Sequence, residues 1–108
     1  MNISEEEYLK RWDGIIAKAR QITEDKTKLY GVQSIGELGI NGEFVQIHRK
    51  YKRLKNLVWD GDFGDDLLLN GDKYSDTLQD TLLDMLNYCA MMLIIIEETK
   101  NERPVTKD

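Results

Sequence analysis

The sequence feature that most constrains the fold is the stretch from Asp76 to Glu98, which reads DTLQDTLLDMLNYCAMMLIIIEE. Apolar residues recur in it at steps of three and four, the spacing of one face of an α-helix. That face consists of Leu78, Leu82, Met85, Cys89, Met92 and Ile96. Past Asn87 the opposite face turns apolar as well, and a helix that is apolar all round is normally buried. The sequence therefore predicts a long helix that its neighbours enclose.

Two further segments carry helical periodicity. Ser4 and Glu7 form a capping box at the start of the first segment, ahead of an apolar stripe. A near-heptad apolar line from Phe44 to Val58 marks the second, and such a line is typical of a helix that packs in a bundle. The predicted helices span about residues 4–23, 43–59 and 74–99, followed by a flexible tail over residues 100–108. We therefore predict one all-α domain over residues 1–108, a bundle of three to four helices.

The third predicted helix carries more apolar surface than two neighbouring helices would cover. Met91, Ile94 and Ile95 lie on the surplus face. Because a symmetry mate is the simplest cover for such a face, we expect a homodimer or a higher homo-oligomer that buries these three residues.

Charge and composition narrow the classes of partner. The net charge of −5 opposes binding to nucleic acid polymers or to anionic membranes, because both attract basic surfaces. The longest uninterrupted apolar run, Cys89 to Ile96, is too short to span a bilayer, and the acidic N-terminus lacks the apolar core of a signal peptide. Cys89 is the only cysteine, which fits a reducing compartment. We expect a cytoplasmic protein with neither a membrane nor a nucleic acid polymer as its partner.

Three carboxylates follow one another at four-residue steps in the third helix: Asp76, Asp80 and Asp84. This spacing sets successive carboxylates about 6 Å apart on one helix face, where they repel each other unless a cation lies between them. Mg²⁺ suits such a line, because it takes one or two protein carboxylates and fills its remaining positions with waters and substrate phosphates. The three aspartates are therefore candidate Mg²⁺ ligands.

The second helix is the most basic segment of the chain and supplies a complementary charge. Lys50 and Arg53 lie three residues apart, and Arg49 and Arg53 lie four apart, so each pair shares a helix face. Such pairs suit the binding of phosphate oxygens. On the third helix, Tyr88 and Asn87 continue the aspartate line and are candidate contacts to a base or a ribose, with helix packing as the alternative.

Two interpretations of these charges stay open. An acidic helix that faces a basic helix is either a site for a di- or triphosphate or a pair of helices held together by their own charges. In the second interpretation Asp76 and Asp80 bond to Arg49 or Arg53, and no ligand is needed. Ion-pair networks and binding sites use the same residue types, so the pattern alone does not separate the two.

The run of residues 76–88 resembles the ESxxDTLxDLxNY signature of the nucleotide-modification-associated domain 1 family of phages and bacteria. The run KYKRL, residues 50–54, resembles the KxxRL motif on the preceding helix of that family, and Tyr30-Gly31 resembles its DYG turn. The resemblance covers roughly residues 24–95. The signature on the third helix is the most specific of the three.

That family is similar in pattern to the all-α nucleotide pyrophosphatases of the MazG and dimeric dUTPase type. Those enzymes hold Mg²⁺ on acidic residues of two helices and cleave nucleoside triphosphates between the α- and β-phosphates. The resemblance implies a MazG-like bundle in which Asp76, Asp80 and Asp84 hold Mg²⁺, with Asp80 as the catalytic residue. It also implies that Lys50 and Arg53 contact phosphates.

The chain departs from the pyrophosphatase pattern on the second helix. The pyrophosphatases carry an ExxE pair there, whereas the nearest residues in this chain are Gln46 and Arg49, which do not bind Mg²⁺. In an oligomer, Glu5, Glu6 or Glu37 of another subunit would supply the missing acids.

The resemblance predicts a nucleotide-binding protein that acts as a Mg²⁺-dependent nucleoside triphosphate pyrophosphohydrolase in phage or bacterial nucleotide metabolism. A phage-encoded chain would work in the host cytoplasm. Two alternatives stay open. The first is a non-catalytic helical oligomer that sequesters a nucleotide or uses it as a regulatory signal. The second is a structural or protein-interaction bundle whose charges only pair.

Overall fold

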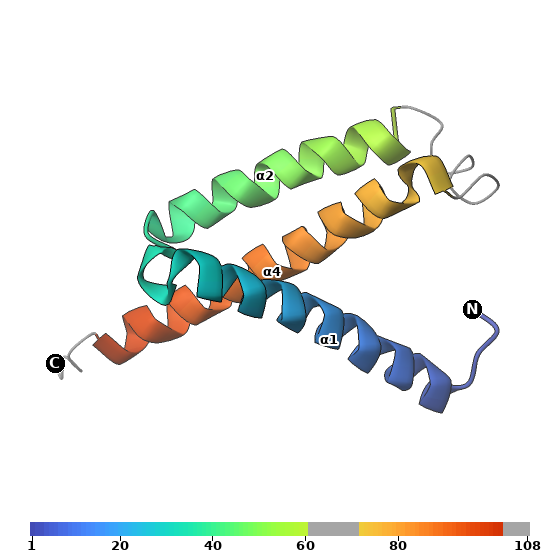
Figure 1. The fold of residues 1–108 in the computed structure, drawn as a ribbon, viewed down its shortest axis with the longest axis horizontal. Helices are drawn as coiled ribbons and strands as arrows, with labels where there is room; N and C mark the ends of the chain where they lie inside the picture. Colours follow the sequence, from blue (N-terminus) through green and yellow to red (C-terminus); the bar gives the residue numbers. More distant parts are fainter. Residues whose placement is uncertain (61–71, 103–108) are drawn as a thin grey trace, which may run out of the picture. The chain divides into compact units, whose positions relative to one another are not determined.

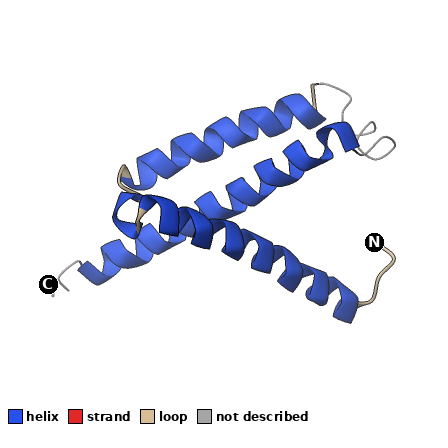
Figure 2. Cartoon of the chain, viewed as in Figure 1, coloured by secondary structure: helices blue, strands red, loops and turns tan. Residues whose placement is uncertain are grey.

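The structure, a computed structural model, describes residues 1–60 and 72–102, and for residues 72–76 it describes the backbone alone. Helices joined by short loops make up these residues, and no strand occurs among them (Figures 1 and 2). The all-α fold class is thus confirmed for this part of the chain. The Cα positions divide into two compact units, Met1–Ile35 and Gly36–Asp108. A single domain over residues 1–108 stays a prediction.

The first unit holds helix α1, Glu5–Tyr30, followed by the short 3-10 helix η1, Val32–Ser34. The Ser4 hydroxyl accepts a hydrogen bond of 3.1 Å from the backbone N–H of Glu7, which caps α1 as the sequence predicts. The helix ends where Gly31 adopts a φ of +80°, a conformation that favours glycine.

Helix α1 is longer than predicted, because it continues past residue 23 to Tyr30. Side-chain pairs one turn apart support the added turns: Gln21 Nε2 donates to Asp25 Oδ1 at 3.0 Å, and Lys28 Nζ pairs with Glu24 Oε1 at 3.3 Å. Each exposed pair of this kind stabilises a helix by about 0.3–0.5 kcal/mol. The apolar pattern stops at Ile22. Apolar periodicity therefore predicts too early an end for α1, because it does not register the charged pairs that continue the helix.

The second unit contains an antiparallel helical hairpin. Helix α2, Gly39–Val58, and helix α4, Asp72–Glu102, run side by side in opposite directions (Figure 1). Helix α2 begins four residues before the predicted position 43. Gly36, just ahead of it, has a φ of +72°, and a Cβ at this position would lie 3.1 Å from Cδ1 of Ile95 on α4. The absence of a side chain at Gly36 lets the start of the hairpin approach α4 closely.

The two glycines Gly36 and Gly14 are expected to respond to alanine in opposite ways. Gly36→Ala places a side chain in a left-handed backbone and against Ile95, so we expect it to lower the free energy of unfolding by about 1–3 kcal/mol. Gly14 lies within α1 with nothing within 4 Å of an added Cβ, so Gly14→Ala should raise it by about 1 kcal/mol. Urea unfolding of both variants measures the difference. A Gly36→Ala chain as stable as the wild type contradicts the close approach.

Helix α4 turns Asp84 toward α2. Asp84 contacts Lys50 of α2, and Ile95, three turns further along the same side, meets Gly36. In contrast, Leu82, Cys89 and Ile96 belong to the face predicted to be buried and are exposed. Leu78, Met85 and Met92 of the same predicted face are partly buried, so the prediction of a buried face holds within one chain for these three residues and is wrong there for Cys89. Helical periodicity identifies an apolar face, but it does not say which neighbour covers that face.

One described helix is long and apolar enough to cross a membrane by length and composition alone, over Thr77–Glu102. Core helices of soluble proteins pass the same test when they are mostly buried, whereas 6% of the most apolar window is buried here. Both the cytoplasmic location and the lack of a membrane partner stay predictions.

Candidate functional site

The charges of the two hairpin helices meet at an ion pair between Lys50 and Asp84. The distance from Lys50 Nζ to Asp84 Oδ2 is 3.0 Å, and only 20% and 19% of the two side chains are exposed. Lys50 lies on the same face of α2 as Ile47 and Leu54, which are partly buried. The periodicity that packs α2 against α4 therefore also directs this lysine toward Asp84. Lys50, Asp80 and Asp84 are called the hairpin site below.

The hairpin buries polar side chains. Among the residues of the second unit that the structure describes, those less than a tenth exposed are Glu43, Thr81 and Asn87. The Thr81 hydroxyl donates a 2.7 Å hydrogen bond to the carbonyl of Thr77 and is thereby satisfied. Interiors of small proteins consist mainly of aliphatic side chains, because burying polar groups costs free energy. The α2–α4 interface therefore differs from an ordinary apolar core.

Glu43 is a buried acid that the analysis of the sequence missed. Only 8% of the residue is exposed, and its Oε2 atom has no hydrogen-bond partner among the described residues. Burial raises the pKa of the Glu43 carboxyl above its ordinary value, because the charged form loses its hydration. Glu43 lies two turns before Lys50 on the same face of α2, about 10 Å along the helix axis. A signal was present in the sequence, since Glu43 is the acid three residues before Gln46.

The predicted acidic residues fall in different surroundings. Asp84 is mostly buried and paired with Lys50, whereas Asp80, one turn earlier, is exposed. Tyr88, one turn beyond Asp84, is partly buried on the same side of α4. The side chain of Asp76 lies outside the described residues.

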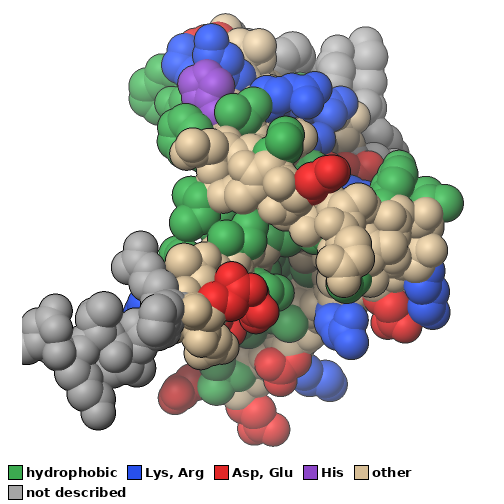
Figure 3. Space-filling view, turned by 90° about the vertical axis from the view of Figure 1, so that its left-hand side faces the viewer, with side chains coloured by type: hydrophobic (Ala, Val, Ile, Leu, Met, Phe, Trp, Pro, Cys, Tyr) green, Lys and Arg blue, Asp and Glu red, His purple; other side chains and the backbone are tan. Residues whose placement is uncertain are grey.

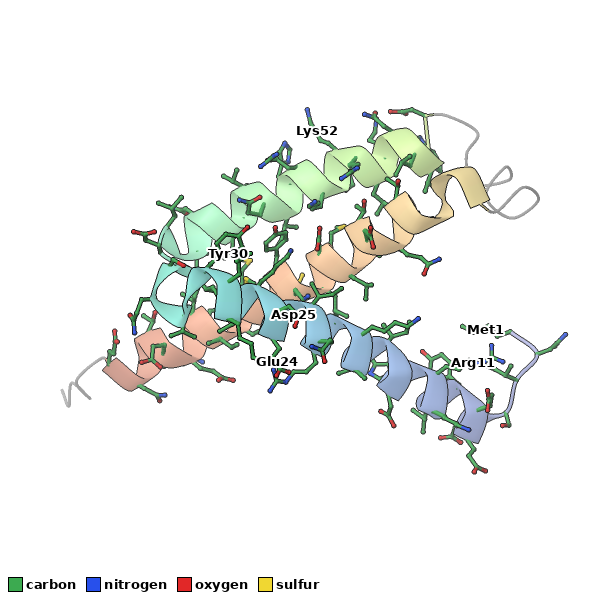
Figure 4. All side chains as sticks on the ribbon, in the orientation of Figure 1. Met1, Arg11, Glu24, Asp25, Tyr30 and Lys52 are labelled. Carbon is green, nitrogen blue, oxygen red and sulfur yellow. The ribbon has the colours of Figure 1, made fainter. Side chains whose placement is uncertain are left out.

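The predicted arginines of α2 stay at the surface. Arg49 and Arg53 are exposed, and Arg49 Nη1 donates a 3.4 Å hydrogen bond to Gln46 of the same helix. Among the described residues, the ion pair between α2 and α4 therefore uses Lys50, and neither arginine joins it. Basic side chains gather around the only histidine in the space-filling view (Figure 3). Lys52 points away from α4 (Figure 4). The basic surface of α2 thus lies mainly on the outer side of the hairpin.

A test of the donor set separates two kinds of Mg²⁺ site. Within the described part of the chain, no group of three or more His, Cys, Asp or Glu side chains is placed to hold a metal ion. Asp80 and Asp84 alone match the one or two carboxylates that Mg²⁺ takes when waters and substrate phosphates complete its octahedron. The residues therefore fit an ion that binds together with a phosphate ligand, and they do not fit a site closed by protein donors alone.

Fold and site define an all-α protein with an antiparallel hairpin and a mostly buried ion pair across it. No protein-family model, curated protein or solved structure matches the chain. Membership of the nucleotide-modification-associated domain 1 family stays a prediction that rests on residues 30–31, 50–54 and 76–88.

Proposed function

We propose that the chain binds a nucleotide through its phosphates at the hairpin site, together with Mg²⁺, and acts as a MazG-like nucleoside triphosphate pyrophosphohydrolase. The observation that carries this proposal is the contact between Lys50 and Asp84. It sets a cation and a carboxylate 3.0 Å apart in surroundings largely shielded from water. Electrostatic interactions are stronger in such surroundings than at an open surface, so a phosphate and its metal ion would be held effectively.

Each residue of the hairpin site has a role in this proposal. Lys50 would exchange its carboxylate partner for a phosphate oxygen, while Asp80 and Asp84 would hold Mg²⁺. The metal ion supplies positive charge to the phosphate oxygens when bound. Arg53, exposed three residues beyond Lys50, would add a second cation at the edge of the site. Tyr88 would contact the base or the ribose.

The same ion pair also favours a second candidate function. Because Lys50 and Asp84 already satisfy one another, the pair alone would hold α2 and α4 together in a structural or protein-interaction bundle. A third candidate is nucleotide binding without cleavage. It follows if the hairpin site has too few metal ligands for hydrolysis, because Gln46 and Arg49 add none. All three candidate functions (hydrolysis, binding without cleavage and a structural bundle) include assembly as a homodimer or a higher homo-oligomer in the cytoplasm.

Titration of the full chain with a panel of nucleoside triphosphates, with and without Mg²⁺, tests the proposed function. We expect one of them to raise the melting temperature and to release pyrophosphate, because a ligand that binds only the folded state stabilises it. Asp80→Asn should lower the rate of release by about a hundredfold, because it removes a metal ligand. Glu98→Gln, an exposed acid on the same helix, is the matched control and should leave the rate unchanged.

Three outcomes separate the candidate functions. Release that depends on Asp80 supports hydrolysis. A rise in melting temperature without release supports sequestration of the nucleotide. If no triphosphate changes the melting temperature, nucleotide binding is wrong and the structural bundle stands.

A further inference from the structure

Helix α4 carries an apolar stripe on the side turned away from α2. Its members alternate at steps of four and three residues, the heptad spacing of a coiled-coil seam. The α4 stripe consists of Leu82, Leu86, Cys89, Leu93 and Ile96. Asp84, which contacts Lys50 of α2, projects from roughly the opposite side of the helix. The hairpin therefore leaves this seam without a neighbour from α2.

The α4 stripe is uncharged, and all of its members except the partly buried Leu86 are exposed. The exposed fractions of Leu82, Leu93 and Ile96 are 46%, 62% and 36%, and Cys89 is exposed as well. Between residues 82 and 96 the heptad positions that flank the stripe are also apolar. They are Leu83, Met85, Ala90 and Met92. Over this length the stripe and its flanking positions carry no charge. Contact with another uncharged apolar surface therefore buries no charged group.

The α4 stripe is centred on Cys89. Leu82 and Ile96 lie seven residues before and after it, and Leu86 and Leu93 lie three before and four after. In a parallel pair of helices each member of the stripe lies opposite its own counterpart in the second copy. This arrangement places Cys89 opposite Cys89 of the second copy across a two-fold axis.

We propose that the α4 stripe binds the α4 stripe of a second copy of this chain and forms a parallel, two-fold symmetric coiled coil. Helix α1 is the rival occupant, since it has exposed apolar residues of its own, such as Trp12 and Ile15. However, Arg11 and Lys18 flank that stripe, and the α4 stripe offers no acidic residue to pair with them. An identical uncharged seam is the better electrostatic match.

This interface differs from the one that the sequence analysis expected. Met91 and Ile95 are partly buried on the side of α4 that faces α2, and Ile94 is exposed but off the α4 stripe. The α4 stripe is thus the proposed location of self-association. Dimer formation through it does not depend on nucleotide binding, so either can fail without the other.

Oxidation of the full chain at Cys89 tests the symmetry directly. With copper phenanthroline at low protein concentration, we expect most of the chain to form a dimer linked through Cys89, since it is the only cysteine. The control carries Cys89→Ser and Lys52→Cys, which moves the thiol to an exposed position that points away from α4 (Figure 4). This control should stay almost entirely unlinked. Equal linking of the two proteins overturns the proposal.

A pair of matched substitutions tests the seam without oxidation. Leu93 and Ile94 are equally exposed, at 62% and 61%, but only Leu93 lies on the α4 stripe. We expect Leu93→Glu to weaken the dimer at least tenfold in light scattering and sedimentation, whereas Ile94→Glu should keep the dimer. Circular dichroism checks that both variants stay helical. A monomeric wild-type chain overturns the proposal, and so does equal behaviour of the two variants. A wild-type monomer that binds phosphatidylcholine vesicles would assign the α4 stripe to a lipid surface.

Discussion

Replacing Lys50 with alanine is expected to lower the free energy of unfolding by about 3 kcal/mol. The Lys50 ammonium lies 3.0 Å from the Asp84 carboxylate, and four-fifths of each side chain is shielded from solvent. Removal of the cation leaves a mostly buried carboxylate without this counter-ion. The desolvation of that carboxylate is then poorly compensated, which is why truncating one partner of a buried pair is costly. Urea unfolding of the wild type and of Lys50→Ala measures the loss.

Lys52→Ala is the matched control for this prediction. Lys52 is exposed on the same helix and points away from α4 (Figure 4), so its removal should change the free energy of unfolding by less than about 0.5 kcal/mol. Combining Lys50→Met with Asp84→Leu should recover most of the loss, because an apolar pair replaces both charges. Equal losses for Lys50→Ala and Lys52→Ala would show that the ion pair does not stabilise the hairpin.

The Glu43→Gln variant is expected to be more stable than the wild type at pH 7 by about 1–2 kcal/mol and equally stable near pH 4. Burial raises the pKa of the Glu43 carboxyl, so the folded chain binds this proton more tightly than the unfolded chain does. The stability that belongs to the protonated form is fully present below the unfolded pKa. It is lost as the pH rises through the raised folded pKa. Glutamine keeps the shape and does not ionise, so it removes this loss.

Glu37→Gln controls for the general effect of removing one negative charge. Glu37 is exposed, in the short connection before α2, so its replacement should shift the stability little and equally at each pH. Chemical unfolding of the three proteins between about pH 4 and pH 8 gives the comparison. If the difference between Glu43→Gln and the wild type does not grow with pH, Glu43 does not carry a raised pKa in the folded chain.

The helices and the meeting of an acidic with a basic helix follow from local sequence signals. The capping box at Ser4 and the three-and-four spacing of apolar residues mark where helices form, because both act within one or two turns. The apolar pattern does not predict the end of α1, because charged pairs such as Glu24 with Lys28 extend the helix beyond that pattern. Helix ends depend on weak local pairs, and apolar periodicity does not register them.

The partner choices within the candidate site depend on how α2 and α4 align, and no local signal fixes that alignment. Three cations on α2 have the spacing to pair with the aspartates, and the alignment selects Lys50 for Asp84. The same alignment buries Glu43, whose charge suggests a surface position. It also turns Asp84 inward and leaves Cys89 outside. These features are tertiary, so the order of residues along one helix does not determine them.

A crystal structure of the chain with Mg²⁺ and a non-hydrolysable nucleoside triphosphate tests the central claim most directly. The proposed function predicts phosphate density at the hairpin site, with Lys50 Nζ turned from Asp84 to a phosphate oxygen and Mg²⁺ bound by Asp80 and Asp84. A chain that keeps the 3.0 Å contact between Lys50 and Asp84 under saturating nucleotide, with no phosphate beside it, contradicts the claim.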